Sequence, residues 1–221
     1  MATHWSEVPI HVIDFEGSRA SGVVEYGVVT LLDGGVSEVR TRICAPKGGH
    51  IPEAETRVHG IGRAQTAGAA PFELERELFM NLRSSGPLCA HNAAFEKHLI
   101  KSVWPYPRSS PDFLNAGRDV ADWGPWVDTL RLYEQIYPQM PEFGLGALLK
   151  RFGLTAELDA LAAAHCPPER SRYHCALYDA LGSALLLLRL GRLEEFESMN
   201  TQWLVEHSQP AAAQAGQQEL F

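Results

Sequence analysis

Residues 10–16 read Ile10-His11-Val12-Ile13-Asp14-Phe15-Glu16, an apolar run that ends in two carboxylates. Alternate side chains of an extended segment project to the same side, so Asp14 and Glu16 face one point while Phe15 faces apolar surroundings. Open α/β sheets commonly bind their ligands at strand ends. The stretch therefore predicts a buried strand with a polar site at its carboxyl end.

Near the other end of the chain, His174 stands five residues before Asp179. On one helix that offset is roughly 140° of rotation, so the two side chains would not share a face. They converge if His174 lies on the loop that follows Pro167-Pro168 and Asp179 lies within the helix expected from about 176. A histidine placed there suits a general base, because imidazole exchanges protons near neutral pH.

A third acidic position lies between them, in Ala90-His91-Asn92-Ala93-Ala94-Phe95-Glu96. Magnesium and manganese prefer carboxylate oxygens as ligands. Two such ions about 3.5–4 Å apart can hold both the attacking and the leaving oxygen of a phosphodiester. Any one of these motifs alone is more typical of a structural role, but the set and its order predict a metal-dependent phosphoryl-transfer site.

The three motifs together resemble those of the DnaQ-like exonucleases of the DEDDh class, in the ribonuclease-H-like superfamily. The matching positions are Asp14 and Glu16; His91, Asn92, Ala93 and Phe95; and His174, Ala176, Asp179 and Ala180. Val58-His59-Gly60-Ile61 and Asp128-Thr129-Leu130 resemble two further landmarks of that family. The resemblance covers roughly residues 8–192, and its last motif is the most specific.

The resemblance implies a 3′→5′ exonuclease that removes nucleoside monophosphates from DNA 3′ ends, in replication or repair. Two Mg²⁺ or Mn²⁺ ions would be held by Asp14, Glu16, Glu96 and Asp179, with His174 as the general base. The terminal nucleotide would contact Phe15, His59, Gly60 and Ile61. Two alternatives stay open, an exoribonuclease of the same chemistry and a catalytically weak adaptor that binds nucleic acid or a clamp.

Position 96 departs from the family pattern, because Glu96 stands where an aspartate is usual. Glutamate keeps the charge and adds one carbon–carbon bond, about 1.5 Å of reach. Since a misplacement of about 1 Å can cost on the order of 10²-fold in rate, this position keeps the adaptor alternative open. The intact remainder of the motifs favours a working site.

The chain has 221 residues, with 27 acidic and 19 basic ones and a net charge of −8. This length predicts one domain, over residues 1–207, with a sizeable core. The acidic balance is unusual for a nucleic-acid binder, which contacts phosphates through lysine and arginine. The few candidates for such contacts, each alone more typical of a solvated surface charge, are Lys97, Lys101, Arg63, Arg170 and Arg172.

Residues 208–221 have the composition of a flexible tail and end in Gln217-Gln218-Glu219-Leu220-Phe221. This end resembles the bacterial sliding-clamp-binding pentapeptide at Gln217, Leu220 and Phe221. A flexible tether that presents two apolar anchors is suited to a pocket on a partner. The sequence therefore predicts a sliding clamp as a partner, against the alternative that the match is accidental.

The four cysteines form no Cys-x-x-Cys pair and no common zinc pattern, so we expect reduced thiols in a cytoplasmic protein. No apolar run is long enough to span a membrane.

The expected fold is an α/β, ribonuclease-H-like mixed sheet of five strands flanked by helices. We expect strands at 9–15, 23–32, 36–44, 87–90 and 126–128, with a turn at Asp33-Gly34-Gly35. Helices are expected at 71–84, from 93 onward with Asn92 as N-cap, and at 129–136, 143–152, 176–190 and 192–206. The aromatic-rich connection 104–125 could stack on an unpaired base or simply pack onto the body.

Overall fold

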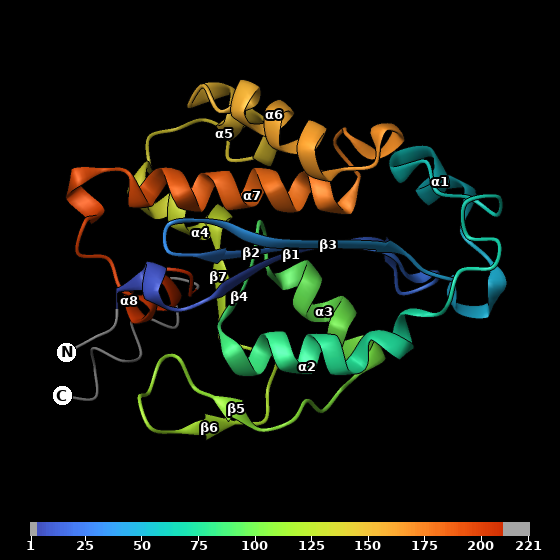
Figure 1. The fold of residues 1–221 in the computed structure, drawn as a ribbon, viewed down its shortest axis with the longest axis horizontal. Helices are drawn as coiled ribbons and strands as arrows, with labels where there is room; N and C mark the ends of the chain where they lie inside the picture. The colour runs from blue at the N-terminus through green and yellow to red at the C-terminus, as the bar shows by residue number, and fades with distance from the viewer. Residues whose placement is uncertain (1–3, 210–221) are drawn as a thin grey trace.

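The computed structural model describes residues 4–209, and its centre is the predicted five-stranded mixed sheet (Figure 1). The strand order is β3-β2-β1-β4-β7, with β1 antiparallel to β2 and parallel to β4. The strands are β1 (Ile10–Ser18), β2 (Gly22–Leu32), β3 (Gly35–Ile43), β4 (Leu88–Ala90) and β7 (Trp126–Asp128). The expected fold class is confirmed.

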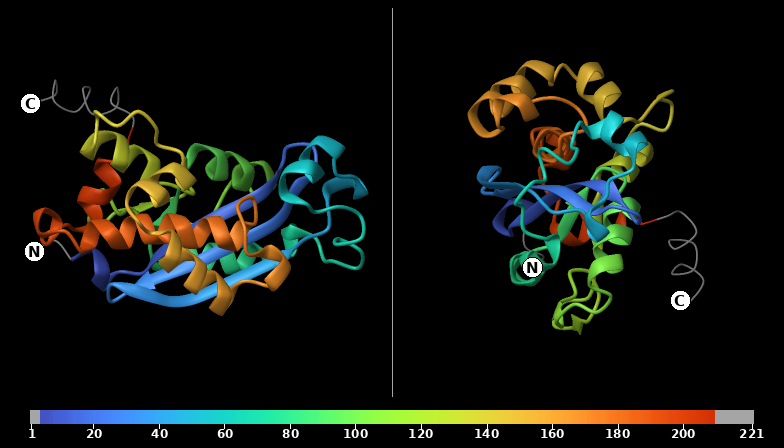
Figure 2. Two further views of the ribbon diagram at one scale, coloured as in Figure 1. Left: turned by 90° about the horizontal axis from the view of Figure 1, so that it is seen from above. Right: turned by 90° about the vertical axis from the view of Figure 1, so that its right-hand side faces the viewer.

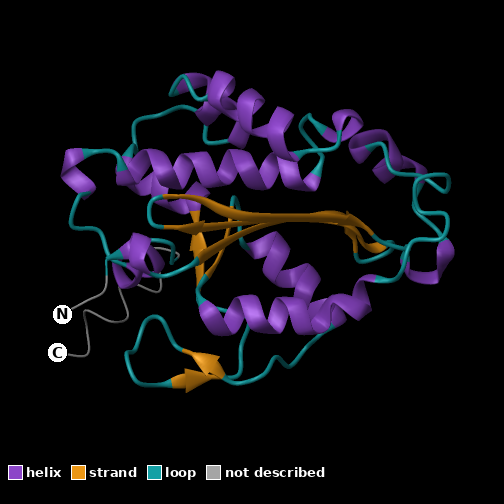
Figure 3. Cartoon of the chain, viewed as in Figure 1, coloured by secondary structure: helices purple, strands orange, loops and turns teal. Residues whose placement is uncertain are grey.

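Helices cover both faces of the sheet, as Figures 1 and 3 and the right-hand view of Figure 2 show. On one face lies α7 (Ala176–Gly191), with α5 (Leu145–Arg151) and α6 (Thr155–His165) packed outside it. On the other face lie α2 (Arg76–Ser85) and α3 (Ala94–Val103). The remaining elements are α1 (Glu53–His59), α4 (Thr129–Ile136), α8 (Thr201–Glu206), the small pair β5 (Ser110–Pro111) and β6 (Asp119–Val120), and 3-10 turns at Trp5–Glu7, Lys47–Gly49, Phe72–Glu75, Pro168–Arg170 and Glu194–Phe196.

The side chains of β1 point alternately to the two faces of the sheet, so they pack in two separate cores. Ile10 and Val12 pack in the core beneath α7, whereas Ile13 and Phe15 pack in the core beneath α2 and α3. Because side chains two apart share a face of a strand, Asp14 and Glu16 follow Val12 toward α7, the helix that carries Asp179.

The β2–β3 hairpin turns where the sequence predicts it. Asp33 and Gly34 both have positive φ, 52° and 74°, between the paired residues Leu32 and Gly35. Two positive-φ residues form the two-residue turn that matches the twist of an antiparallel pair.

Three expectations for the helices were incomplete. The single helix expected over 192–206 is a 3-10 turn at Glu194–Phe196 followed by the separate helix α8, and neither α1 nor α6 was expected. α6 lacked a clear signal because its sequence, Thr155-Ala-Glu-Leu-Asp-Ala-Leu-Ala-Ala-Ala-His165, is rich in alanine around the whole helix and marks no apolar stripe.

The aromatic residues of the connection 104–125 mostly pack onto the body. Trp104 stacks on Phe72 with ring centroids 4.7 Å apart, and the buried Trp123 donates its indole N–H to the carbonyl of Trp104 at 2.7 Å. Tyr106 is exposed. The packing interpretation therefore holds for both tryptophans.

The folded part extends at least to Ser208, which is buried and whose hydroxyl accepts the backbone N–H of Asp128 at 2.8 Å. Gln217, Leu220 and Phe221 lie outside the described residues, so binding to a sliding clamp stays a prediction.

Over residues 4–209, no helix is long and apolar enough to cross a membrane. The four cysteines, all within that range, are buried free thiols.

Candidate active site

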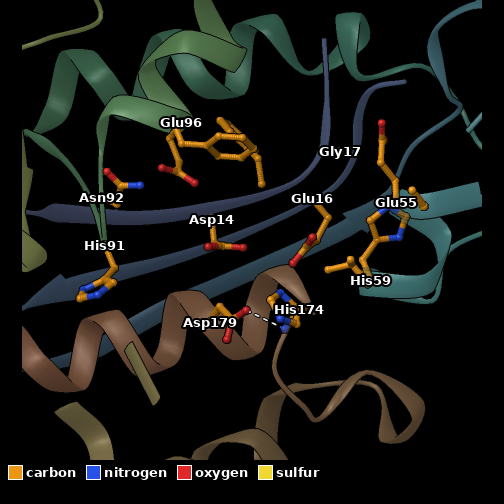
Figure 4. Close-up of a pocket in the computed structure, with 14 residues that line it drawn as sticks. Asp14, Glu16, Gly17, Glu55, His59, His91, Asn92, Glu96, His174 and Asp179 are labelled. Carbon is orange, nitrogen blue, oxygen red and sulfur yellow. Dashed lines mark hydrogen bonds between the residues drawn. The ribbon is translucent and has the colours of Figure 1, made fainter. Parts of the chain in front are cut away.

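A pocket of about 460 Å³ opens at the carboxyl end of β1 (Figure 4). It gathers side chains from β1, α1, α3 and α7, which lie far apart in the sequence. All five residues predicted for catalysis and metal binding line it, namely Asp14, Glu16, Glu96, His174 and Asp179. Figure 4 shows Asp14 between Glu96 on one side and Asp179 on the other, with Glu16 and His174 beside them.

The pocket exists because β1 is longer than its parallel neighbour. β4 pairs only with His11 and Val12, so Asp14 and Glu16 lie beyond the end of β4. The ladder with β2 then shifts register immediately after Glu16, at Gly17. Gly17 has φ 130°, and a Cβ there would lie 2.0 Å from the carbonyl oxygen of Gly22, so the bulge requires glycine.

A second glycine brings α7 to the site. Gly27 on β2 pairs with Asp14, and a Cβ at Gly27 would lie 2.4 Å from backbone atoms of Ala176 and Leu177. The first turn of α7 therefore rests directly on β2 next to Asp14. This close approach places Asp179 beside the carboxylates of β1.

Glu96 reaches the site from the first turn of α3, and Asp128 fixes how that helix begins. The two carboxylate oxygens of Asp128 accept the backbone N–H groups of Asn92 and Ala93, both at 3.0 Å. The expectation that Asn92 caps the helix was wrong, because Asn92 is left-handed (φ 68°) and the N-cap position is Ala93. Asp128, at the end of β7, supplies the acceptor in its place.

The clustered carboxylates repel one another in a buried setting. Burial and then the charge of Asp179 raise the pKa of Glu16 to about 8, and burial raises the pKa of Asp179 to about 7. The pKa values of Asp14 and Glu96 are raised by burial and by the neighbouring carboxylates. A site that disfavours its own ionised groups in this way is suited to bound cations.

The donor set fits divalent cations. Oε2 of Glu96 and Oδ1 of Asp179 are buried and have no hydrogen-bond partner among the described residues. Glu16, His174 and Asp179 each offer a ligand atom within 4.8 Å of the other two, while Asp14 and Glu96 line the same pocket outside this tight group. Oxygen donors in this number suit a hard divalent ion.

His174 stands on the entry loop of α7, as its spacing from Asp179 predicts. Its side chain is exposed, whereas its backbone N–H donates to Oδ2 of Asp179 at 2.8 Å. The residue is left-handed, with φ 60°. A non-glycine residue keeps such a conformation only where its surroundings hold it there.

A buried ion pair between Glu25 and Arg170 supplies that hold. Arg170 Nε donates to Glu25 Oε1 at 3.0 Å and a second guanidinium N–H donates to Oε2, with the two side chains 3% and 9% exposed. The same guanidinium donates to the backbone carbonyls of His59 and His174, and Glu25 accepts the backbone N–H of Ala176 at 2.9 Å. Arg170 is thus committed to the fold and does not serve as a phosphate contact.

The residues predicted to contact the nucleotide are only partly brought together. His59 lines the pocket with Val58, but Gly60 and Ile61 are not among the lining residues. Ile61 is buried, and its backbone N–H donates to Nδ1 of His59 at 3.0 Å. Phe15 also lines the pocket, while its buried ring packs against Phe72 and Phe79, with centroids 5.4 and 5.6 Å apart.

Glu55 is a pocket residue that no motif in the sequence indicates. It comes from α1 and accepts hydrogen bonds from the hydroxyls of Ser18, at 2.7 Å, and Ser21. Glu55 is one of two glutamates in 53–59, and nothing in its local spacing distinguishes it from Glu53. Its position depends on how α1 packs on the β1–β2 turn.

No family model matches the chain. Curated relatives include PolC-type DNA polymerases III of Streptococcus suis, 26% identical over 72% of this chain, and of Lactococcus lactis, 28% identical over 71%. The chain spans only 10% and 8% of the length of these two proteins.

Solved structures of similar fold include Exonuclease X in complex with 5′-overhanging duplex DNA, with TM-score 0.64, 21% identity, and 90% of this chain and 99% of that chain covered. A 3′-exonuclease bound to a histone mRNA stem-loop has TM-score 0.61 and 14% identity, over 85% and 82% of the two chains. Exonuclease I of E. coli with a dT13 oligonucleotide has TM-score 0.60 and 13% identity, over 84% and 41%. The predicted resemblance is confirmed at the level of the fold, which this chain shares with these exonucleases.

Proposed function

We propose that this chain is a metal-dependent 3′→5′ exonuclease that removes nucleoside monophosphates from DNA 3′ ends. The observation that carries the proposal is the convergence of four carboxylates on one pocket, with an exposed histidine at its edge. Two of the carboxylate oxygens are buried and have no hydrogen-bond partner within residues 4–209. The PolC-type relatives and the DNA held by Exonuclease X support DNA as the substrate, in replication or repair.

In this proposal Asp14, Glu16, Glu96 and Asp179 would hold two divalent ions, magnesium or manganese. Bound ions would supply an activated water and a clamp on the leaving oxygen. A form of the E. coli Exonuclease I–ssDNA complex with a bound zinc ion supports a divalent metal in this fold. His174 would take the proton of the attacking water, because its ring is solvent-accessible while its backbone is fixed to Asp179.

His59 would position the terminal nucleotide. Its Nδ1 accepts the Ile61 N–H, which assigns the ring proton to Nε2. That Nε2 is buried and has no partner among the described residues. An unpaired buried donor costs free energy, so it would be satisfied by an acceptor on the substrate. The Phe15 side chain supports this wall of the pocket from the core.

Degradation of a single-stranded and a 3′-recessed DNA oligonucleotide, labelled at the 5′ end, tests the proposed function. We expect stepwise shortening from the 3′ end with Mg²⁺ or Mn²⁺, release of nucleoside 5′-monophosphates, and no shortening in EDTA. Glu96→Gln, which keeps the side-chain shape and removes its charge, is the control for contaminating nuclease. Binding of DNA without turnover in wild type would support the adaptor alternative instead.

The second candidate is an exoribonuclease of the same chemistry, favoured by the fold neighbour bound to an mRNA stem-loop. The 2′-hydroxyl is the group that distinguishes the two substrates. Matched DNA and RNA oligonucleotides in the same assay decide between them through the ratio of kcat/KM.

The metal-free protein is expected to lose stability as the pH rises from about 5 to 8. The folded pKa values of Glu16 and Asp179, about 8 and about 7, lie above the unfolded values near 4. Between those limits the folded state binds more protons than the unfolded state, so the free energy of unfolding falls with rising pH. We expect Tm in EDTA to fall on the order of 5–10 °C over this range.

Millimolar Mg²⁺ is expected to remove most of that fall, since bound cations offset the repulsion. Asp179→Asn, which removes one of the repelling charges, should show a shallower fall in EDTA. A Tm that rises or stays level between pH 5 and 8 without metal would contradict the carboxylate cluster as described.

A further inference from the structure

A second hollow, of about 450 Å³, opens beside α3, and its titratable lining is entirely basic. It is lined by Arg19, Ala94, Lys97, His98, Lys101 and Ser102. The chain as a whole has 27 acidic and 19 basic residues, so a hollow with no carboxylate among its described lining residues differs sharply from the average surface. We call these six residues the basic hollow.

The basic hollow continues from the active-site pocket along two elements. On α3, Phe95 lines the pocket, and His98, three residues further on and therefore its neighbour on the helix surface, lines the hollow. At the end of β1, Gly17 lines the pocket, and Arg19, which follows the strand, lines the hollow. A polymer bound in the pocket would therefore meet the hollow directly on leaving it.

The spacing along α3 suits a nucleic-acid backbone. Lys101 lies four residues after Lys97 and three after His98, so it neighbours both on the surface of the helix. His98 is three residues beyond Phe95, about 4.5 Å along the axis at 1.5 Å per residue. One strand of B-form DNA carries a phosphate about every 3.4 Å of axis, so the hollow begins within about two nucleotides of the pocket.

The cations of the hollow are available to a ligand. Nζ of Lys101 and Nζ of Lys97 lie 2.7 and 3.8 Å from the carboxylate of Asp122, and both lysine side chains are about two-fifths exposed. Such exposed ion pairs contribute little free energy, and an ammonium has three donors. Arg19 donates its Nε–H to His98, which leaves its other guanidinium donors for a further acceptor.

We propose that the basic hollow binds the phosphodiester backbone of the strand whose 3′ end occupies the pocket, about two nucleotides from the scissile bond. This rests on the proposed function for the location of the 3′ end. The hollow would supply the local positive charge that the overall balance of −8 lacks. Its aliphatic lysine stems would lie along the sugars while the ammonium groups reach the phosphates.

The test compares Lys97→Gln/Lys101→Gln with wild type in the full chain. Fluorescence anisotropy with a labelled 12-nucleotide single strand and Ca²⁺ gives Kd from 50 to 200 mM KCl, without depending on cleavage. Losing two phosphate contacts should lower the slope of log Kd against log salt by about 1.4, at about 0.7 per contact for a single strand. Kd at 100 mM KCl should rise about tenfold, and KM for cleavage should rise with it at unchanged kcat.

The matched control is Lys150→Gln/Arg151→Gln, which removes the same charge from exposed positions on α5. The p-nitrophenyl ester of thymidine 5′-monophosphate, too short to reach the hollow, reports on the pocket alone. If wild type binds the strand but cleaves neither substrate, the proposed function fails while the hollow is still tested by Kd. Equal Kd and salt slope in wild type and variant, an equal loss in the α5 control, or no strand binding by wild type would each overturn the proposal.

Discussion

Replacing His174 with alanine is expected to lower kcat about 10²–10⁴-fold, the range that one positioned general base contributes. The side chain is exposed at the pocket edge and makes no packing contribution that alanine would remove from a core. The contacts that hold the loop are made by its backbone, through Asp179 and Arg170, and alanine keeps them. Tm and oligonucleotide Kd should therefore stay near the wild-type values.

The same variant separates two roles for the imidazole. His174 offers a nitrogen within 4.8 Å of the carboxylates of Glu16 and Asp179, so its geometry also suits a metal ligand. If it is the base, His174→Ala should keep the Mg²⁺-dependent rise in Tm, and added imidazole should restore part of kcat. Loss of the Mg²⁺ effect would assign it to the metal.

His165 provides the matched control, because it is another exposed histidine, at the end of α6 and outside the pocket. His165→Ala should leave kcat unchanged. A His174→Ala variant within threefold of wild type would remove this residue from the mechanism.

The parts of the site that the sequence predicted are those set by local geometry. Asp14 and Glu16 share a face because a strand has a period of two, and His174 precedes Asp179 because the helix can begin only after the proline-containing loop. Asp128 was recognised only because Asp128-Thr129-Leu130 resembles a motif of the DnaQ-like exonucleases, and no role was predicted for it. Its role, accepting N–H groups of Asn92 and Ala93, depends on β7 and β4 pairing side by side.

The parts that could not be predicted depend on contacts between distant segments. Glu25 and Arg170 are 145 residues apart. From the sequence, Glu25 is expected only to lie in a strand, and Arg170 is expected to be a basic side chain on the surface. Glu55 enters the pocket only because two serine hydroxyls of the β1–β2 turn bind it. No local sequence period predicts such long-range pairs. The residues that position the site were therefore harder to predict than the proposed catalytic and metal-binding residues.

Removing either partner of the Glu25–Arg170 pair is expected to destabilise the protein by about 3–5 kcal/mol, because the remaining charge is left buried and unpaired. Glu25→Leu and Arg170→Met should each lower Tm by roughly 6–20 °C. The matched control is Arg192–Glu157, which is also doubly hydrogen-bonded but whose side chains are 53% and 38% exposed. Removing either member of that exposed pair should cost no more than about 1 kcal/mol.

The double variant Glu25→Leu/Arg170→Met distinguishes support of the fold from positioning of the base. Replacing both charges by apolar groups removes the unpaired charge, so most of the lost stability should return. The carbonyls of His59 and His174 and the N–H of Ala176 would still lack their partners. Because a displacement of about 1 Å costs on the order of 10²-fold in rate, kcat should stay about 10²-fold low, with KM changed far less. Recovery of kcat together with Tm would show that the pair stabilises the fold without positioning His174.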